Sequence, residues 1–147
     1  MRNAINSLML VLLLISLSVA TGCSTLADVV GKKEDGTSQI YSVSVDQAWE
    51  IAKVVFRTEG TDAIEEHRAE GYMLTSSGMN MVSWGAVMGA WIDPVGKDET
   101  KVTVLTKRRI TINIATTLME STFHKRFAQG VGIVKAGKPL PPLLPSD

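Results

Sequence analysis

The sequence predicts a small α+β protein in which two helices pack on one antiparallel sheet, behind an amino-terminal signal. Two segments place apolar residues at three-and-four spacing, which is typical of amphipathic helices. Several short segments alternate apolar and polar residues between turn signals, which is typical of half-buried strands. The expected order is β-α-β-β-β-β-α, within a single domain at residues 39–130 of the 147-residue chain.

The composition limits the classes of partner and site. Fifteen Lys and Arg balance 15 Asp and Glu, and this neutrality gives no electrostatic reason to expect a nucleic-acid partner. The single cysteine excludes an internal disulfide. Because His67 and His124 are the only histidines, we expect no metal centre and no cofactor.

Residues 1–22 have the three parts of a secretory signal peptide. Arg2 supplies a positive start, and residues 8–19 form an apolar run of twelve. A membrane-spanning helix needs about 20 apolar residues, whereas the apolar region of a signal peptide needs about 7–15. The run therefore indicates a signal peptide, with an uncleaved anchor as the alternative.

The signal ends in Ala20-Thr21-Gly22-Cys23, which resembles the lipobox of bacterial lipoproteins. The usual leucine three residues before the cysteine is Ala20 here. The resemblance implies a diacylglyceryl thioether on Cys23, cleavage between Gly22 and Cys23, and acylation of the new amino group by a fatty acid such as palmitate. An ordinary signal peptide followed by a coincidental cysteine is the alternative.

Ser24 follows the cysteine. In many Gram-negative lipoproteins an aspartate at this place retains the protein at the inner membrane. The resemblance therefore implies a cell-envelope protein at the outer membrane that faces the periplasm, if the host has two membranes. Its first partner is then the membrane itself, through the lipid anchor.

Both flanks of the domain are expected to lack regular structure. Residues 23–38, which are Cys23 and a glycine-containing charged segment, are typical of a flexible tether. Residues 131–147 carry four prolines between Pro139 and Pro145, which favours an extended, disordered tail. Its PxxP pattern is a weaker candidate for docking into an aromatic groove.

The first half of the domain is expected to begin with a strand and a helix. Residues 39–45 alternate, with Tyr41, Val43 and Val45 on one side. Ser44 and Gln47 have capping-box spacing for a helix over residues 45–58, and Gly60 is suited to end it. Its apolar stripe consists of Ala48, Trp49, Ala52, Val55 and Phe56.

The central segments are expected to form a meander. A hairpin is expected from two strands, at residues 62–67 and 72–77, joined by a turn at Gly71. An apolar strand is expected within residues 79–92, followed by a turn at 93–96 and a strand at 100–110.

The last element is expected to be a second helix. Thr117 and Glu120 have capping-box spacing, and Gly130 is expected to close the helix. His124 falls beside the apolar stripe, which favours a surface position. The stripe itself consists of Ala115, Leu118, Met119, Thr122, Phe123 and Phe127.

This order resembles the small helix-grip domains of envelope lipoproteins, including accessory lipoproteins of the outer-membrane protein assembly machinery. It also resembles a family of small bacterial lipoproteins classed only as a domain of unknown function. The residues that carry the resemblance are the runs Ser-Val-Asp-Gln-Ala-Trp at 44–49 and Glu-Gly-Tyr-Met-Leu-Thr at 70–75. Neither family supplies catalytic residues to carry over.

One local cluster contains metal-binding residue types, namely Glu65, Glu66, His67 and Glu70. On a strand, Glu65 and His67 share one face and Glu66 lies on the other. A solvated strand end is therefore favoured over a metal site. The basic run at 107–109 is likewise favoured as a solvated strand end over a contact with anionic lipid.

We expect no enzyme, because Cys23 is committed to lipid and no serine lies in a nucleophile elbow. A non-catalytic module that binds an envelope protein, or has a structural role, is favoured. Trp84 and Trp91 are candidate partner contacts, although core packing is favoured for both. A second function, carriage of a small apolar ligand or lipid, would need a cavity, and a periplasmic hydrolase is the least favoured alternative. The residues expected to line such a cavity are Trp49, Val55, Phe56, Leu118 and Phe123.

Overall fold

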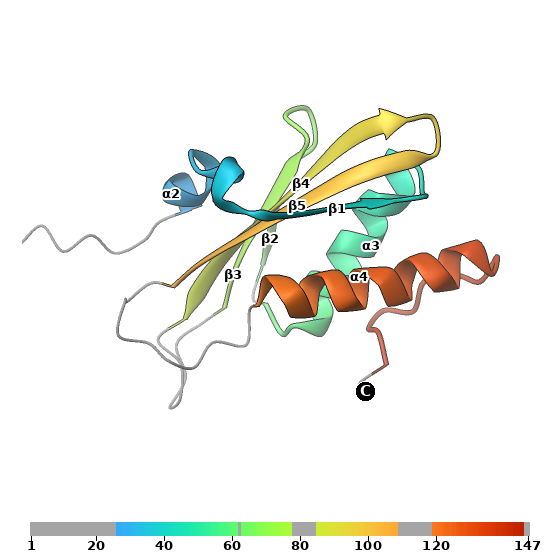
Figure 1. Ribbon diagram of the computed structural model, residues 1–147. Coiled ribbons are helices and arrows are strands. Elements are labelled where there is room, and N and C mark those ends of the chain that lie inside the picture. The colour runs from blue at the N-terminus through green and yellow to red at the C-terminus, as the bar shows by residue number, and fades with distance from the viewer. Residues whose placement is uncertain (1–25, 62, 78–84, 109–118, 146–147) are drawn as a thin grey trace, which may run out of the picture.

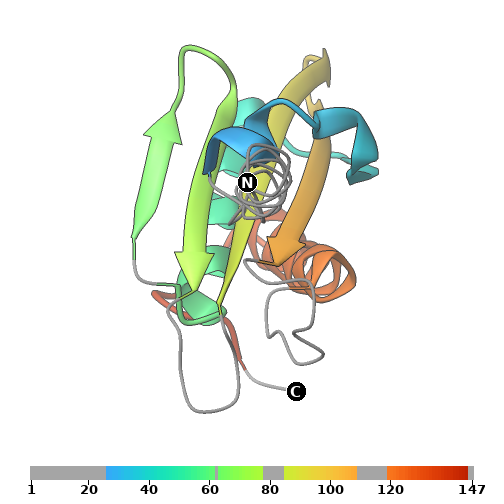
Figure 2. The ribbon, with the colours of Figure 1, turned by 90° about the vertical axis from the view of Figure 1, so that its left-hand side faces the viewer.

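The computed structural model describes residues 26–61, 63–77, 85–108 and 119–145. The expectations for the signal peptide, Cys23, Ser24, Trp84 and Leu118 lie outside these residues. Within them the predicted α+β class is confirmed. Two long helices pack on one face of a five-stranded antiparallel sheet, and a short helix lies on the other face (Figures 1 and 2).

The sheet has the spatial order β1-β5-β4-β3-β2, and each neighbouring pair is antiparallel. Because α3 lies between β1 and β2 in the chain, it joins the two edge strands across the inner face. The predicted element order is confirmed, with one additional helix before β1. The long elements are β1 (Thr37–Tyr41), α3 (Val45–Thr58), β2 (Ile64–His67), β3 (Tyr72–Ser77), β4 (Ala86–Gly96), β5 (Glu99–Arg108) and α4 (Glu120–Lys135).

Helix α3 has the bounds that its local sequence predicts. The Ser44 hydroxyl accepts a hydrogen bond from the Gln47 amide, and the Gln47 side chain accepts one from the Ser44 amide. Gly60 adopts a positive φ of 71° just after the helix. Strand β1 ends earlier than expected, at Tyr41, because the Val43 amide donates to the Tyr41 carbonyl and turns the chain.

The turn expected at residues 93–96 is wrong, because β4 continues to Gly96 and the turn is formed by residues 97–98. Pro94 still faces Thr100 across the ladder, with a register irregularity between Pro94 and Gly96. A bulge of this kind accommodates a residue that has no amide hydrogen to donate.

Helix α4 differs from its prediction at both ends. Its N-cap is Met119 without a side-chain cap, whereas the expected cap Thr117 lies outside the described residues. The Glu120 carboxylate accepts from the Thr106 amide instead of closing a capping box. Gly130 does not end the helix; it lies buried inside α4, where a Cβ would come within 2.6 Å of Ile51 Cγ2.

The tail at residues 131–147 was expected to be disordered, and over residues 131–145 that expectation is wrong, since α4 continues to Lys135. Leu144 is buried in the main core, Leu140 packs against the core, and the Leu144 amide donates to the Thr58 hydroxyl at 2.9 Å. Leu140 and Leu144 supply the apolar surface that packs on the core, whereas Leu143 is exposed.

The flexible tether expected at residues 23–38 is also wrong from Leu26 on. Helix α2 (Leu26–Val30) and the short 3₁₀ helix η2 (Lys33–Asp35) lie on the outer face of the sheet (Figure 2). Val29 is fully buried there, and Gly89 leaves room for it, because a Cβ on Gly89 would lie 2.7 Å from Val29 Cγ1. The second core cluster on this face consists of Val29, Leu74, Val87, Trp91 and Leu105.

Candidate functional site

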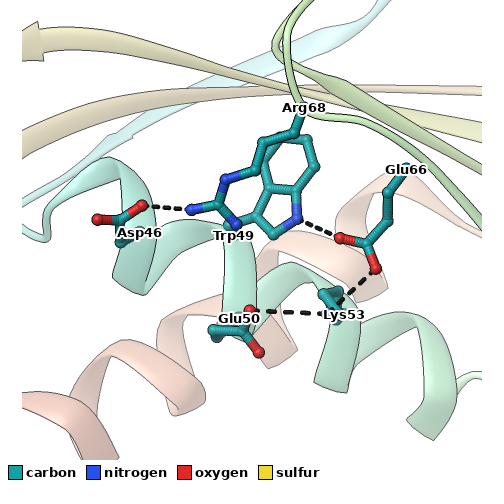
Figure 3. A network of polar contacts seen from close by, with 6 residues as sticks. All are labelled: Asp46, Trp49, Glu50, Lys53, Glu66 and Arg68. Atoms are coloured by element: carbon teal, nitrogen blue, oxygen red, sulfur yellow. Dashed lines mark hydrogen bonds and ion pairs between the residues drawn. The ribbon is translucent and has the colours of Figure 1, made fainter.

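A network of polar contacts joins the start of α3 to the β2–β3 hairpin (Figure 3). The Trp49 indole N–H donates to Glu66 Oε2 at 2.6 Å. The Lys53 ammonium lies 3.1 Å from Glu66 Oε1 and 3.6 Å from Glu50 Oε1. The almost fully buried indole is therefore held in one orientation, with its only polar atom satisfied.

The Arg68 guanidinium covers this indole from the hairpin turn. Its central carbon lies 5.1 Å from the Trp49 ring centroid, within the range of a cation–π contact. Arg68 also forms an ion pair with Asp46. The two side chains are 53% and 84% exposed, so the ion pair contributes little to stability and can exchange its partner with a bound molecule.

These residues border an open hollow of about 350 Å³, here called the Trp49 hollow. Its volume lies at the small end of the range for ligand sites, roughly 300–1,000 Å³. The lining is mainly apolar and includes three charged side chains, those of Arg68, Glu70 and Asp93. The hollow is lined by Val45, Trp49, Arg68, Ala69, Glu70, Gly71, Ile92, Asp93 and Pro94.

The electrostatics of the network favour a fixed charge at Glu66. The Trp49 hydrogen bond lowers the pKa of Glu66, as do the hydrogen bond and charge of Lys53 and the charge of Arg68. Its carboxylate is therefore ionised at neutral pH and is already engaged by donors. Such a group orients Trp49 and is poorly suited to accept a proton from a substrate.

The acidic cluster around His67 is divided between two faces, as the strand pattern predicts. His67 Nε2 lies 2.7 Å from Glu65 Oε1 on the outer face, and the His67 ring stacks on Tyr72. Glu66 points to the opposite side, toward α3, and Glu70 borders the Trp49 hollow. Among the described residues, no three His, Cys, Asp or Glu side chains lie close enough to hold a metal ion.

Trp91, a candidate partner contact for which core packing was favoured, is 4% exposed and belongs to the outer-face cluster beneath α2. Its indole therefore packs in a core, and Trp84 lies outside the described residues. Lys107 lies 3.9 Å from Asp35 of η2, and Arg108 is an exposed strand end. Arg109, the third residue of that basic run, is not described.

The expected surface position of His124 is wrong, because its side chain is 3% exposed. Its Nε2 lies 3.0 Å from the Thr37 carbonyl, and its Nδ1 lies 2.9 Å from the Tyr41 hydroxyl. A carbonyl only accepts, so Nε2 donates to Thr37, while Nδ1 shares the Tyr41 hydroxyl with Gln39 Oε1, to which that hydroxyl donates at 2.9 Å. Burial raises the pKa of Tyr41 to about 12, which keeps this hydroxyl a donor.

Of the residues expected to line a carrier cavity, the four that the structure describes are packed together in the main core. Val55, Phe56 and Phe123 are fully buried, and the Phe56 and Phe123 ring centroids are 5.3 Å apart. Trp49 alone of the described set borders the Trp49 hollow. A smaller hollow of about 290 Å³ lies beside α2, lined by Leu26, Ala63, Ile64, Glu65, Leu74, Thr75 and Ser76.

The Trp49–Arg68 pair was not found by sequence reasoning. The two residues are 19 positions apart, and each has an ordinary local explanation: Trp49 belongs to an apolar helix stripe and Arg68 to a turn. Their contact requires the packing of α3 against the hairpin. The only sequence feature that could have indicated this site was a tryptophan close to the capped start of a helix.

No protein-family model matches the chain, and no curated protein is significantly similar to it. Within the described ranges, none of the helices has both the length and the apolar character needed to cross a membrane.

Proposed function

We propose that the protein is a lipid-anchored, non-catalytic module of a bacterial cell envelope, and that it binds a protein partner. The observation that carries this proposal is the position of Cys23. The only cysteine in the chain directly follows a twelve-residue apolar run and the small residues Ala20-Thr21-Gly22. Lipid transfer to a lipoprotein requires a thiol at this position, directly after the small residues that follow the apolar run.

The Trp49 hollow is the proposed partner site. Arg is enriched among the residues that dominate binding energy at protein interfaces, and the Arg68 side chain is 53% exposed above the buried Trp49 ring. Here the indole is held by Glu66, and the Arg68 side chain stands at the rim with a weakly held ion-pair partner. Trp49 is 1% exposed, so its ring forms a fixed support beneath Arg68, and a partner that contacts Arg68 would lose little free energy to ordering that support.

The anchor is tested by replacing Cys23 with Ser in the full chain. We expect the wild-type protein to fractionate with membranes and to carry the added mass of acyl chains. The Cys23→Ser variant is expected to keep its signal segment and to lack that mass, because serine offers no thiol. A variant that is processed and attached to membranes as the wild type is would refute the anchor.

The partner site is tested by crosslinking in intact cells. A photoreactive residue at Ala69, which borders the Trp49 hollow, is compared with one at Ala128 on the exposed side of α4. We expect one predominant envelope protein to be captured from Ala69 and not from Ala128. An added Arg68→Ala change should reduce that capture severalfold. Capture of the same abundant proteins from both positions would contradict a partner site at the hollow.

A further inference from the structure

The segment that follows the proposed lipid site is fastened to one face of the sheet. Val29 is fully buried over Gly89 and Trp91. The Lys33 ammonium donates to both carboxylate oxygens of Asp93, at 2.9 and 2.7 Å. Leu26, the first described residue, therefore begins a segment that is held against the outer face.

Only two residues separate Leu26 from Cys23, so at full extension the two Cα atoms lie within about 11 Å. By comparison, the eleven-residue β4 spans about 36 Å. A lipid on Cys23 would therefore hold α2 close to the headgroups and leave the domain little freedom to turn over. The helix layer of α3 and α4, whose helices are each about 10–12 Å across, lies on the opposite face (Figure 2).

We infer that the outer face of the sheet lies against the phospholipid leaflet that holds the anchor, with α3 and α4 pointing away from it. This inference rests on the proposed lipid anchor. The exposed groups of this face include the uncharged Ile40, 59% exposed, together with Lys32 and Glu34 of opposite charge. Further charges on this face are paired, Lys33 with Asp93 and Lys107 with Asp35, so we assign the orientation to the short tether rather than to charge attraction.

The orientation also places the proposed partner site. Leu26 borders the smaller hollow together with Leu74, Thr75 and Ser76, near the end of β3. The Trp49 hollow lies at the other end of the β2–β3 hairpin and is walled by α3. Six residues of β3 span about 20 Å, so the Trp49 hollow is separated from Leu26 along the sheet. Its α3 wall lies on the face that points away from the leaflet, where a water-soluble partner can reach it.

The test uses the lipidated full chain, in which the thioether leaves Cys23 without a reactive thiol. Single substitutions add one labelling site: Lys32→Cys or Ile40→Cys on the outer face, and Arg57→Cys or Ala128→Cys on the helix layer, all at exposed positions. Each variant is labelled with a fluorophore and placed in vesicles of phosphatidylethanolamine and phosphatidylglycerol that contain a headgroup quencher. Equal urea midpoints check that the variants fold alike.

We expect severalfold stronger quenching at Lys32→Cys and Ile40→Cys than at Arg57→Cys and Ala128→Cys, with little dependence on salt. Equal quenching at both faces, or stronger quenching at the helix layer, would overturn the inference. A mass spectrum taken first separates the two proposals. Absence of the acyl mass refutes the anchor and the orientation with it, whereas an acylated protein without a quenching difference refutes the orientation alone.

A matched control lengthens the tether. An insert of about ten Gly and Ser residues between Thr25 and Leu26 raises the typical reach to roughly 20 Å without changing the lipid or the domain. We expect the difference between the two faces to disappear. A difference that persists would show that the face itself binds lipid, which would overturn the tether as the cause.

Discussion

The crossing of α3 and α4 offers a sharp test of the packing. Alanine at Gly130 would place a Cβ 2.6 Å from Ile51 Cγ2, a separation at which something must shift. Ile51 is fully buried and β-branched, so it has little freedom to move. Overpacking of this kind costs about 1–3 kcal/mol, whereas alanine is favoured over glycine inside a helix by about 1 kcal/mol. Gly130→Ala should therefore lower the free energy of unfolding by up to about 2 kcal/mol.

Gly132 provides a matched control two residues further along the same helix. A Cβ there meets nothing within 4 Å, so Gly132→Ala should gain only the helix preference and stabilise the protein by about 0.5–1 kcal/mol. The free energies are measured by urea denaturation, followed by tryptophan fluorescence. The double variant Gly130→Ala/Ile51→Ala should show a favourable coupling energy, because the clash is removed.

Equal stabilisation by the two glycine replacements would refute the reasoning, since it would mean that Gly130 has no close neighbour across the helix interface. Absence of coupling between residues 130 and 51 would refute the assignment of the clash to Ile51. Either result would require the two helices to lie further apart than the described arrangement.

Three further predictions concern individual contacts. Burial raises the pKa of Glu59 above 4.5, and the charge of Arg126, 2.9 Å away, opposes this rise. The protonated Glu59 carboxyl therefore contributes to the free energy of unfolding at low pH, and this contribution is lost as the pH rises through the raised pKa. Because Arg126→Ala leaves an ionised Glu59 buried without its partner, it should lower the free energy of unfolding by roughly 2 kcal/mol at neutral pH and by less below pH 4.5, where Glu59 is protonated. Urea denaturation at both pH values measures this, and an equal decrease in the free energy of unfolding at both would contradict the prediction. Trp49→Phe removes the largest cause of the lowered pKa of Glu66, so an NMR titration should show that pKa rising toward 4.5, and an unchanged value would mean that Lys53 dominates. Val29→Ala deletes two methyl groups from the fully buried side chain by which α2 packs on the sheet, and should lower the free energy of unfolding by about 1–2 kcal/mol. A negligible change in the free energy of unfolding, measured by urea denaturation, would show that α2 is not tightly docked.

Elements whose determinants lie close together in the chain were predicted well. The start of α3 depends on Ser44 and Gln47, three residues apart, and the following turn depends on Gly60. The β2–β3 hairpin depends on Gly71 and on alternation within a few residues. In each case one short segment contains both the hydrogen-bonding groups and the apolar pattern, so its own sequence is enough to specify it.

The errors share the opposite property. His124 is buried because β1, 83 residues earlier, supplies Tyr41 as its partner. Leu144 is ordered because Thr58, 86 residues away, accepts its amide. Gly130 lies inside α4 rather than at its end, and its missing Cβ leaves room for Ile51 of α3 to pack against the helix. Local rules assigned these residues to a surface, a disordered tail and a helix end, since their partners cannot be identified from spacing.

The candidate site divides in the same way. The sequence by itself determined the proposed lipid position at Cys23, the capped helix that carries Trp49, and the alternation that separates Glu66 from Glu65 and His67. Only the tertiary structure placed Arg68 over the Trp49 ring and α2 over the opposite face of the sheet. Capping and strand alternation act over a few bonds, whereas these contacts exist only after loops of many residues have closed and distant apolar surfaces have been removed from water.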